Sequence, residues 1–495
     1  MLLYAIHHLI GYKDMTLDQI KNFRQLNSVT PGHPEYGHTL GIETTTGPLG
    51  QGISTAVGMA IAERILNSRF GDDIVDHNTY VIASDGDLME GISHEAIGLA
   101  GHLGLSKLIV LYDSNNISID GSLDLSDSTD QIKRFDASGW STREIDGHDY
   151  AQIEEAIAEE LKTDSPSLIA CKTTIGFGSP DKAGTSASHG APLSQEEIDN
   201  MKKNLGWDYE PFEIPTDIKD AWRLIGLKNT SERKDWEDRL SNIDDKKKVK
   251  FLHAVNGDIS DLVKKNLQNL KQKYSSENPK LATRQSSQQV LEILNDVVEE
   301  MVGGSADLTP SNNTKTKNID PISKNNIKGR FIHYGIREHG MAAAMNGMAL
   351  HKGIIPYSGT FLIFSDYCRP SIRLAALMGI KVIHVMTHDS IGVGEDGPTH
   401  QPIEQIPSLR SIPNLNVFRP GDATEVAECW EIAISSSKPS ILALSRQGCE
   451  HFRNIYESSN KCESVSYTHL RAHETGRNIV CRILLEKKKG VGGGG

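Results

Sequence analysis

The sequence predicts an α/β protein made of two consecutive domains, each built on a doubly wound parallel sheet. Short apolar, β-branched runs alternate with helix-compatible stretches from residue 1 to about 200. A second pattern of the same kind extends from residue 282 to about 447. This alternation is typical of parallel sheets that are covered by helices on both faces. Two such domains of similar size indicate two halves that share one site.

The first domain is expected over residues 1–215. Its strand candidates are short runs of apolar and β-branched residues, at 79–83, 107–112 and 167–171. Its helix candidates are longer stretches, one opened by the glycine-rich turn 44–52, and they lie at 56–64 and 91–103. Strand, helix and strand in this order predict a parallel unit with polar loops at the carboxyl ends of the strands.

Residues 216–280 are rich in Lys, Asp and Asn and have few glycines. We expect solvated helices there that connect the domains, because a basic run preceded by aspartates is usually a solvated face. The second domain is expected over 281–462, with strand candidates at 329–334, 354–358, 381–386 and 440–445. After about residue 463 the pattern stops, and we predict that residues 463–495 are an artefactual or disordered tail without chemistry.

Composition narrows the class of protein. The chain has 495 residues, 38% of them hydrophobic, and a net charge of −13, which argues against general binding to nucleic acid or anionic membranes. No stretch approaches the ~20 apolar residues of a membrane span. The six cysteines show no C-x-x-C spacing, so neither a zinc site nor a disulfide framework is indicated, and we expect a cytoplasmic protein.

One polar cluster predicts a metal site. Asp85 and Gly86 follow the strand 79–83, and Asn115 follows the strand 107–112. A carboxylate, an amide oxygen and a main-chain carbonyl suit Mg²⁺ when diphosphate oxygens complete its octahedron. Taken alone, the pair Asp85-Gly86 is equally compatible with a common turn.

Several motifs together resemble the transketolase family of thiamine-diphosphate enzymes. They occur in the family's order from Met1 to about Arg453: TPGHP (30–34), ETTTGPLGQG (43–52), MEGISHE (89–95), IDG (119–121), SHGAP (188–192), GGSAD (303–307), GIREH (335–339) and GVGEDGPTH (392–400). The resemblance implies a diphosphate-binding domain that is truncated at its N-terminus, followed by a pyrimidine-binding domain. It also implies a homodimer with active sites at the subunit interface, and it identifies the family's third, C-terminal domain as absent.

The resemblance implies thiamine diphosphate with Mg²⁺ as cofactors, Ca²⁺ and Mn²⁺ being alternatives. The implied metal ligands are Asp85, Asn115 and the carbonyl of Ile117. The implied cofactor-binding residues are Gly47, Pro48, Leu49, Gly86, Asn115, His189, Asp307, Glu338, Phe361, Phe364 and Tyr367. Ser84 departs from the glycine that the family usually has at this position, but the ligand Asp85 is retained.

Glu338 resembles the family's catalytic glutamate, which hydrogen-bonds a ring nitrogen of the cofactor pyrimidine. Without the family, a glutamate beside Arg337 is more often half of a surface ion pair. The aromatic residues Phe361, Phe364 and Tyr367 recur every three positions, which predicts one face of a helix. By resemblance they form the pocket around the pyrimidine, although core packing is the ordinary explanation of such spacing.

The remaining site residues are assigned to the sugar substrate by resemblance. His33, His189 and His388 are implied to be catalytic, since imidazole suits proton transfer at neutral pH. The implied substrate-binding residues are His33, His189, Arg284, Ser311, His388, Asp396, His400 and Arg446. The two arginines and Ser311 would clamp a distal phosphate, which favours sugar phosphates over free sugars.

The family resemblance implies transfer of a two-carbon ketol unit from a ketose phosphate to an aldose phosphate, as in the pentose phosphate pathway. Two sister enzymes remain alternatives, dihydroxyacetone synthase and deoxyxylulose-phosphate synthase, and so does a non-catalytic cofactor-binding or dimerising fragment. Two functional histidines of the family would precede Met1. We therefore expect an active natural gene product, whereas this polypeptide is expected to be weakly active or inactive.

Overall fold

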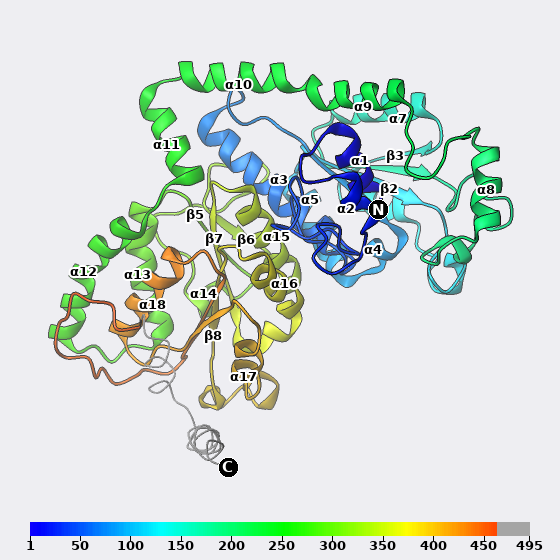
Figure 1. The fold of residues 1–495 in the computed structure, drawn as a ribbon. Helices are drawn as coiled ribbons and strands as arrows, with labels where there is room; N and C mark the ends of the chain where they lie inside the picture. Colours follow the sequence, from blue (N-terminus) through cyan, green and yellow to red (C-terminus); the bar gives the residue numbers. More distant parts are fainter. Residues whose placement is uncertain (463–495) are drawn as a thin grey trace, which may run out of the picture. The chain divides into compact units, whose positions relative to one another are not determined.

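Two parallel sheets organise the chain in the computed structural model, which describes residues 1–462 (Figure 1). The sheets belong to two units, which confirms the predicted fold class. The first unit consists of residues 1–256, 322–328 and 342–354, and the described residues of the second are 257–321, 329–341 and 355–462. The predicted tail at 463–495 lies outside the described residues.

The sheet of the first unit has the strand order β1-β2-β4-β3, with every pairing parallel. Its strands are β1 (Thr79–Ser84), β2 (Leu108–Ser114), β3 (Ser141–Asp146) and β4 (Ser167–Lys172). In β4 the first five residues are all buried, as expected for a strand covered on both faces. The register pairs Ser84 with Asp113, so the ends of β1 and β2 bring their following loops to the same sheet edge.

Several helices of the first unit contact this sheet, and the helix predicted over 91–103 has these bounds in the structure. The helices of this unit are α1 (Leu2–Ile10), α2 (Leu17–Lys21), α3 (Gln51–Phe70), α4 (Asp85–Met89), α5 (Gly91–Leu103), α6 (Gln131–Ala137), α7 (Tyr150–Glu160), α8 (Gln195–Asn204), α9 (Thr216–Lys228), α10 (Thr230–Asn242) and α11 (Asp245–Asn256), with short 3₁₀ turns η1 (Leu123–Leu125) and η2 (Ser186–Ser188). The central helix α3 crosses residues 342–351 closely, since a Cβ on Gly58 would lie 1.9 Å from the carbonyl oxygen of Ala344.

The sheet of the second unit has the parallel order β6-β5-β7-β8-β10-β9. Its strands are β5 (Met301–Ser305), β6 (Phe331–His333), β7 (Ile355–Phe361), β8 (Ile383–Thr387), β9 (Asn416–Phe418) and β10 (Ser440–Leu444). Its helices are α12 (Ser260–Glu277), α13 (Thr283–Val297), α14 (Thr309–Asn312), the start of α15 (Glu338–His351), α16 (Ser365–Met378), α17 (Gln405–Arg410) and α18 (Ala423–Ser435), with η3 (Leu362–Phe364), η4 (Ile391–Val393) and η5 (Pro398–His400).

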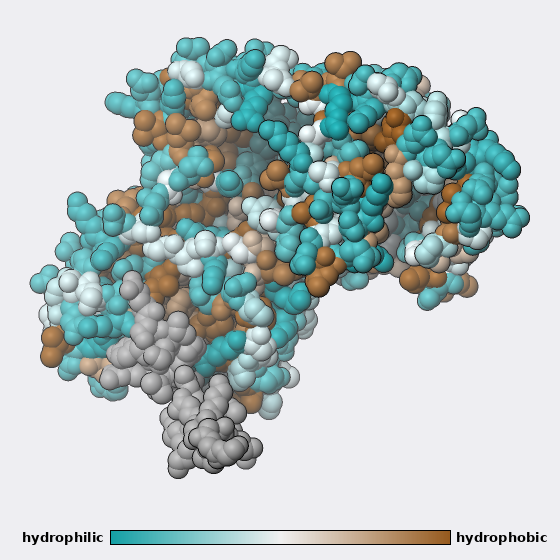
Figure 2. Space-filling model, viewed as in Figure 1, coloured by the Kyte–Doolittle hydropathy of each residue, from teal (hydrophilic) through white to brown (hydrophobic). Residues whose placement is uncertain are grey.

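The expectation of solvated helices over 216–280 is correct for α9 and α10 but wrong for α12. Neither α9 nor α10 has a buried residue, and Figure 2 shows mainly hydrophilic side chains over the nearby α8 as well. By contrast, α12 packs on α13 and α18, with Val263 and Leu267 fully buried in a core that includes Trp430. The buried face of α12 was not recognised in the sequence, because its buried positions recur only every three or four residues and lysines lie between them.

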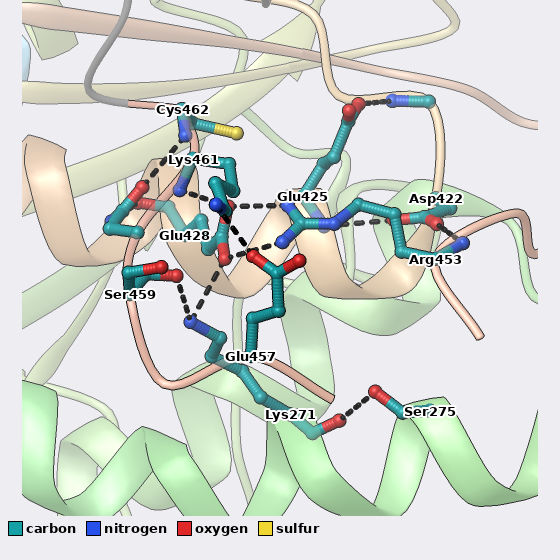
Figure 3. A network of polar contacts seen from close by, with 12 residues as sticks. Lys271, Ser275, Asp422, Glu425, Glu428, Arg453, Glu457, Ser459, Lys461 and Cys462 are labelled. Atoms are coloured by element: carbon teal, nitrogen blue, oxygen red, sulfur yellow. Dashed lines mark hydrogen bonds and ion pairs between the residues drawn. The ribbon is translucent and has the colours of Figure 1, made fainter. Parts of the chain in front are cut away.

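A buried ionic network joins α12 and α18 to the last described residues (Figure 3). The Glu428 carboxylate is 0% exposed and accepts hydrogen bonds from Arg453, while Lys271 Nζ lies 2.9 Å from its Oε1. Burial by itself raises the pKa of Glu428, but the hydrogen bonds and charges of Arg453 and Lys271 outweigh it and lower that pKa. Lys271 also donates to the Ser459 carbonyl at 3.2 Å.

No helix within residues 1–462 is both long and apolar enough to cross a membrane.

Candidate active site

The predicted site residues fall in both units. Those of the first unit are His33, Gly47, Pro48, Leu49, Asp85, Gly86, Asn115, Ile117 and His189. Those of the second unit are Arg284, Asp307, Ser311, Glu338, Phe361, Phe364, Tyr367, His388, Asp396, His400 and Arg446. Each group is described within its own unit.

Asp85 lies at the carboxyl end of β1 and is the first residue of α4, so the predicted acidic turn is the start of a short helix. Its side chain is 3% exposed. Tyr112 Oη donates to one carboxylate oxygen, and the Asn116 amide donates to the other at 3.1 Å. Burial raises the pKa of Asp85, although these hydrogen bonds oppose the effect. The sheet therefore holds a buried carboxylate that has donors around it but no cation paired with it within residues 1–462.

The loop after β2 brings the other predicted metal ligands to Asp85. Asn115 Oδ1 accepts from the Ile117 amide at 3.0 Å, and Asn115 Nδ2 donates to Asp113 at 3.3 Å. The charge of Asp113 also contributes to the raised pKa of Asp85. Asp113 was not among the predicted site residues, although its place at the end of a parallel strand is a signal that could have found it.

Asp87 is a second residue that the sequence analysis left without a role. Its carboxylate accepts from the Ser84 amide at 2.9 Å, from Ser84 Oγ at 2.8 Å and from the Gly50 amide at 3.1 Å. Ser84 and Asp87 form a capping box, a pattern that a Ser followed three residues later by an acid predicts. Asp87 therefore fastens the Asp85 turn to the loop that precedes α3.

The glycine-rich loop 47–50 lies against the same turn. A Cβ on Gly86 would approach Leu49 Cδ1 to 3.1 Å, so Leu49 lies directly over Gly86. Gly47 has φ +126, and a Cβ there would lie 3.0 Å from the His33 ring. The structure thus brings Leu49 to Gly86 and Gly47 to His33. Pro48 is exposed between them.

The donor set around Asp85 fits a divalent cation. It offers carboxylate and amide oxygens, which hard cations such as Mg²⁺ prefer. A cation would compensate the buried charge of Asp85, whose desolvation is otherwise offset only by hydrogen bonds. Within residues 1–462, no group of three or more His, Cys, Asp and Glu side chains could hold a metal by itself, so ligands such as Asn115 and a main-chain oxygen are required here.

In the second unit, the structure brings the three predicted aromatic rings together but not on one helix face. Phe361 ends β7, Phe364 lies in η3 and Tyr367 lies in α16. The centroids of Phe361 and Phe364 are 5.8 Å apart, as are those of Phe364 and Tyr367. The prediction of helical spacing is therefore wrong, because the chain changes from strand to helix within these seven residues. Tyr367 is 63% exposed.

His388 and His400 contact this aromatic cluster. The His388 ring lies 3.8 Å from that of Phe361, centroid to centroid, and the His400 ring lies 5.4 Å from that of Phe364. His388 is 4% exposed, and burial together with the charges of Arg284 and Arg446 lowers its pKa to about 4. A neutral ring at physiological pH can accept a proton or a hydrogen bond from a hydroxyl group.

The predicted phosphate residues lie near His388, because the charges of Arg284 and Arg446 both act on its pKa, as does that of Asp396. Arg284 Nη1 donates to the Ser311 main-chain carbonyl at 2.7 Å, while its Nε is buried without a hydrogen-bond partner. Arg446 is ion-paired with Glu395, a residue that the sequence analysis did not single out. Ser311 thus contacts Arg284 through its backbone, whereas a hydroxyl contact to phosphate was expected.

Glu338 begins α15 and is 9% exposed. Burial raises its pKa. Arg337 donates instead to the Tyr334 carbonyl at 2.9 Å, so the alternative of a surface ion pair with Arg337 finds no support. Asp307 is exposed with φ +58, and His189 is exposed. In the described part of the chain, no side-chain hydrogen bond, ion pair or ring contact joins Asp307 or His189 to another predicted site residue.

Comparison with known proteins matches both halves of the chain. The model of the transketolase thiamine diphosphate binding domain covers residues 1–259, and that of the transketolase pyrimidine binding domain covers residues 279–450. The transketolase of Cereibacter sphaeroides is 56% identical over 468 residues, which are 94% of this chain and 71% of that protein.

Solved structures give the same family. Transketolase from Leishmania mexicana aligns with a TM-score of 0.87 and 45% identity, covering 91% of this chain and 68% of that chain. A transketolase variant of Pichia stipitis in complex with xylulose 5-phosphate aligns with a TM-score of 0.85 and 39% identity, with the same coverage of 91% and 68%.

Proposed function

The chain belongs to the transketolase family of transferases, and on this premise we propose that Asp85, Asn115 and Ile117 form the metal site of a ketol-transferring active site. The observation that carries the proposal is the buried Asp85 carboxylate, which accepts a hydrogen bond from the Asn116 amide, next to Asn115, and has no paired cation within residues 1–462. The family uses thiamine diphosphate with a divalent metal. The matched relatives carry the transketolase name, which favours this reaction over those of the two sister enzymes.

Residues of the first unit would hold the diphosphate and its metal. Gly86 leaves space for a ligand beside Leu49. A Cβ atom at position 86 would lie only 3.1 Å from Leu49 Cδ1 and would fill this space. Gly47 and Pro48 belong to the same loop, and His33 lies against it. When bound, the cofactor supplies a carbon nucleophile and an electron sink for cleaving the bond between C2 and C3 of the ketose.

Residues of the second unit would control protons and position the substrate. Glu338 has a raised pKa, which suits a carboxyl group that shares its proton with a ring nitrogen. The neutral His388 would accept a hydrogen bond or a proton from a sugar hydroxyl, and His400 contacts the same Phe361 ring. We assign His189 and Asp307 to the site by their family motifs alone.

Sugar phosphates are the proposed substrate class. Arg284 and Arg446 are close enough for their charges to act on each other, and guanidinium groups bind phosphate through planar pairs of donors. The Pichia stipitis relative was solved with xylulose 5-phosphate, which supports the same class here. Asp396, whose charge also acts on His388, would accept a hydrogen bond from a sugar hydroxyl.

We further propose a cytoplasmic homodimer with its active sites at the subunit interface. The first unit exposes several large apolar side chains, including Leu26 at 92% and Ile82 at 80%, which a partner subunit would cover. The cysteines of the described residues are free thiols, as expected in a reducing compartment. Light scattering should give the mass of two chains. We retain residues 1–215 and 281–462 as the proposed limits of the two cofactor-binding domains, with α12 packed against the second of them.

Isothermal titration of the purified chain with Mg²⁺ and thiamine diphosphate tests the metal site. We expect saturable binding that Asp85→Asn weakens by about a hundredfold or more, since the variant loses both a ligand and its charge. Asp164→Asn, an exposed change in the same unit, should bind like the unchanged chain. Equal affinity of all three proteins would refute the assignment. Product formation from xylulose 5-phosphate and ribose 5-phosphate tests the reaction separately.

A further inference from the structure

The guanidinium group of Arg446 already binds a carboxylate from its own unit. Its Nη2 is ion-paired with the Glu395 carboxylate, and its Nη1 donates to the Val393 carbonyl at 3.4 Å. The side chains are 35% and 67% exposed, so the pair lies at the surface. Val393 ends the 3₁₀ turn η4, and Glu395 follows it in the connection to η5.

The neighbouring Arg284 has no such acid. Within residues 1–462 it forms no ion pair, it donates to a main-chain carbonyl, and its Nε is buried without a partner. The two guanidinium groups therefore differ: one has a carboxylate bound to it and the other keeps its charge unneutralised. A phosphate that reached both groups would have to take the place of the Glu395 carboxylate on Arg446.

We propose that Glu395 is an internal counter-ion of Arg446, which the phosphate group of a sugar phosphate displaces on binding. The proposal rests on the proposed function, because it takes Arg446 to be a phosphate-binding residue. A carboxylate and a phosphate both fit the planar donors of arginine. A phosphate dianion has the greater charge and can also engage Arg284, so it is the stronger competitor.

The displacement is feasible because exposed ion pairs are weak. Pairs of this kind typically contribute up to about 1 kcal/mol, which corresponds to roughly fivefold in an equilibrium constant. Glu395 therefore lowers the affinity for a phosphate ester without closing the site. It also makes the site selective, because an uncharged sugar or a monoanion gains little from competing with a carboxylate that is already in place.

Calorimetry on the full chain with ribose 5-phosphate as the probe tests the proposal at fixed ionic strength. We expect Glu395→Gln to lower the dissociation constant about two- to fivefold, because the phosphate no longer competes with a carboxylate. Glu404→Gln, an exposed change in the same unit, should leave the dissociation constant unchanged. Where calorimetric heats are small, a ³¹P NMR titration measures the same ratio.

A double-mutant cycle separates the counter-ion role of Glu395 from the assignment of Arg446 as a phosphate-binding residue. Arg446→Gln should weaken binding of ribose 5-phosphate, and in that background Glu395→Gln should have no further effect. If Arg446→Gln weakens binding but Glu395→Gln does not tighten it, the counter-ion proposal is wrong and the phosphate site stands. If Arg446→Gln leaves the affinity unchanged, the phosphate assignment itself is wrong. A purely structural Glu395 would show weaker binding in the Gln variant.

Discussion

Two buried carboxylates, one in each unit, differ in their partners and in the direction of their pKa shifts. Glu428 in the second unit has Lys271 and Arg453 as partners, and its pKa is lowered (Figure 3). Asp85 in the first unit has only hydrogen-bond donors, and its pKa is raised. Both side chains are at most 3% exposed, so burial alone does not explain the difference.

We interpret the difference as that between a structural charge, Glu428, and a proposed metal-binding charge, Asp85. Folding must compensate a buried charge, and Glu428 is compensated entirely by the chain itself. Asp85 is left with an incompletely compensated charge at the edge of a parallel sheet, which is where α/β proteins bind ligands. A buried acid that lacks a cation therefore indicates a metal site when, like Asp85, it lies at such an edge beside other oxygen ligands.

The largest expected effect comes from breaking the paired acid. Glu428→Gln removes the charge that compensates Lys271 and Arg453, and we expect it to lower the free energy of unfolding by about 3–5 kcal/mol. Urea unfolding followed by tryptophan fluorescence measures this, since Trp430 is buried in the same unit. Glu277→Gln, an exposed change on α12, should stay within about 0.5 kcal/mol. A similarly small loss for Glu428→Gln would mean that the network contributes little.

A third buried acid, Glu63 on α3, extends the comparison to a carboxylate without hydrogen-bond partners. Its side chain is 0% exposed, and burial raises its pKa from 4.5 to about 7. Below pH 4.5, Glu63 is protonated in both the folded and the unfolded protein, so it does not lower the free energy of unfolding. As the pH rises from 4.5 towards about 7, the unfolded protein loses this proton first, and the free energy of unfolding falls. Glu63→Gln should therefore raise the free energy of unfolding by up to about 3 kcal/mol at pH 8 and hardly at all near pH 4.

Thermal unfolding across this pH range checks the Glu63 prediction. Glu155→Gln, an exposed change on α7, should give no pH-dependent gain. A gain for Glu63→Gln that is equal at both ends of the range would show that its charge is not responsible.

Asp87 extends the comparison to the surroundings of the proposed metal site, because its carboxylate accepts hydrogen bonds from backbone amides of two segments. Asp87→Ala frees the loop at Gly50 from the Asp85 turn, and we expect Mg²⁺ and thiamine diphosphate to bind about tenfold more weakly. Titration calorimetry measures this affinity. Asp136→Ala, exposed on α6, serves as the control. Ser84→Gly should weaken binding less, since the backbone amide of residue 84 can still donate to Asp87. If Asp87→Ala leaves the affinity unchanged, Asp87 does not position the site.

The smallest effect should have the opposite sign to that of Glu428. Because burial raises the pKa of Asp85, its charge destabilises the metal-free fold once the pH exceeds the ordinary pKa of an aspartate. Asp85→Asn should thus raise the metal-free free energy of unfolding at pH 8 by about 1 kcal/mol. Chemical unfolding in the presence of a chelator measures it. A loss of several kcal/mol would place Asp85 with Glu428 as a structural charge.

Much of the fold followed from local sequence pattern. The strands at 79 and 108 and the bounds of α5 were predictable, because their apolar runs and the glycine that ends α5 act over a few residues. The approach of the loop after β2 to Asp85 was also predictable, since the ends of neighbouring parallel strands meet at one edge. By contrast, α12 was missed because its partners α13 and α18 are distant in sequence, and nothing local distinguishes a buried stripe among lysines.

The aromatic cluster shows the limit of spacing arguments. Phe361, Phe364 and Tyr367 recur every three residues, yet they reach one another from a strand end, a 3₁₀ turn and a helix. The partners of Arg284 and Arg446 were likewise hidden. A main-chain carbonyl at Ser311 and the carboxylate of Glu395 are ordinary groups that gain a role only through their position.

The family, the alternation of strands and helices, and the residue types that can ligate a metal or bind a phosphate all follow from the order of the amino acids alone. The pairing of buried acids with cations follows only from the folded chain. Glu428 binds Lys271 and Arg453, which lie 157 and 25 residues away from it in the sequence. The physical reason is that chemical type is local, whereas desolvation and charge pairing depend on groups that folding brings together from distant parts of the chain.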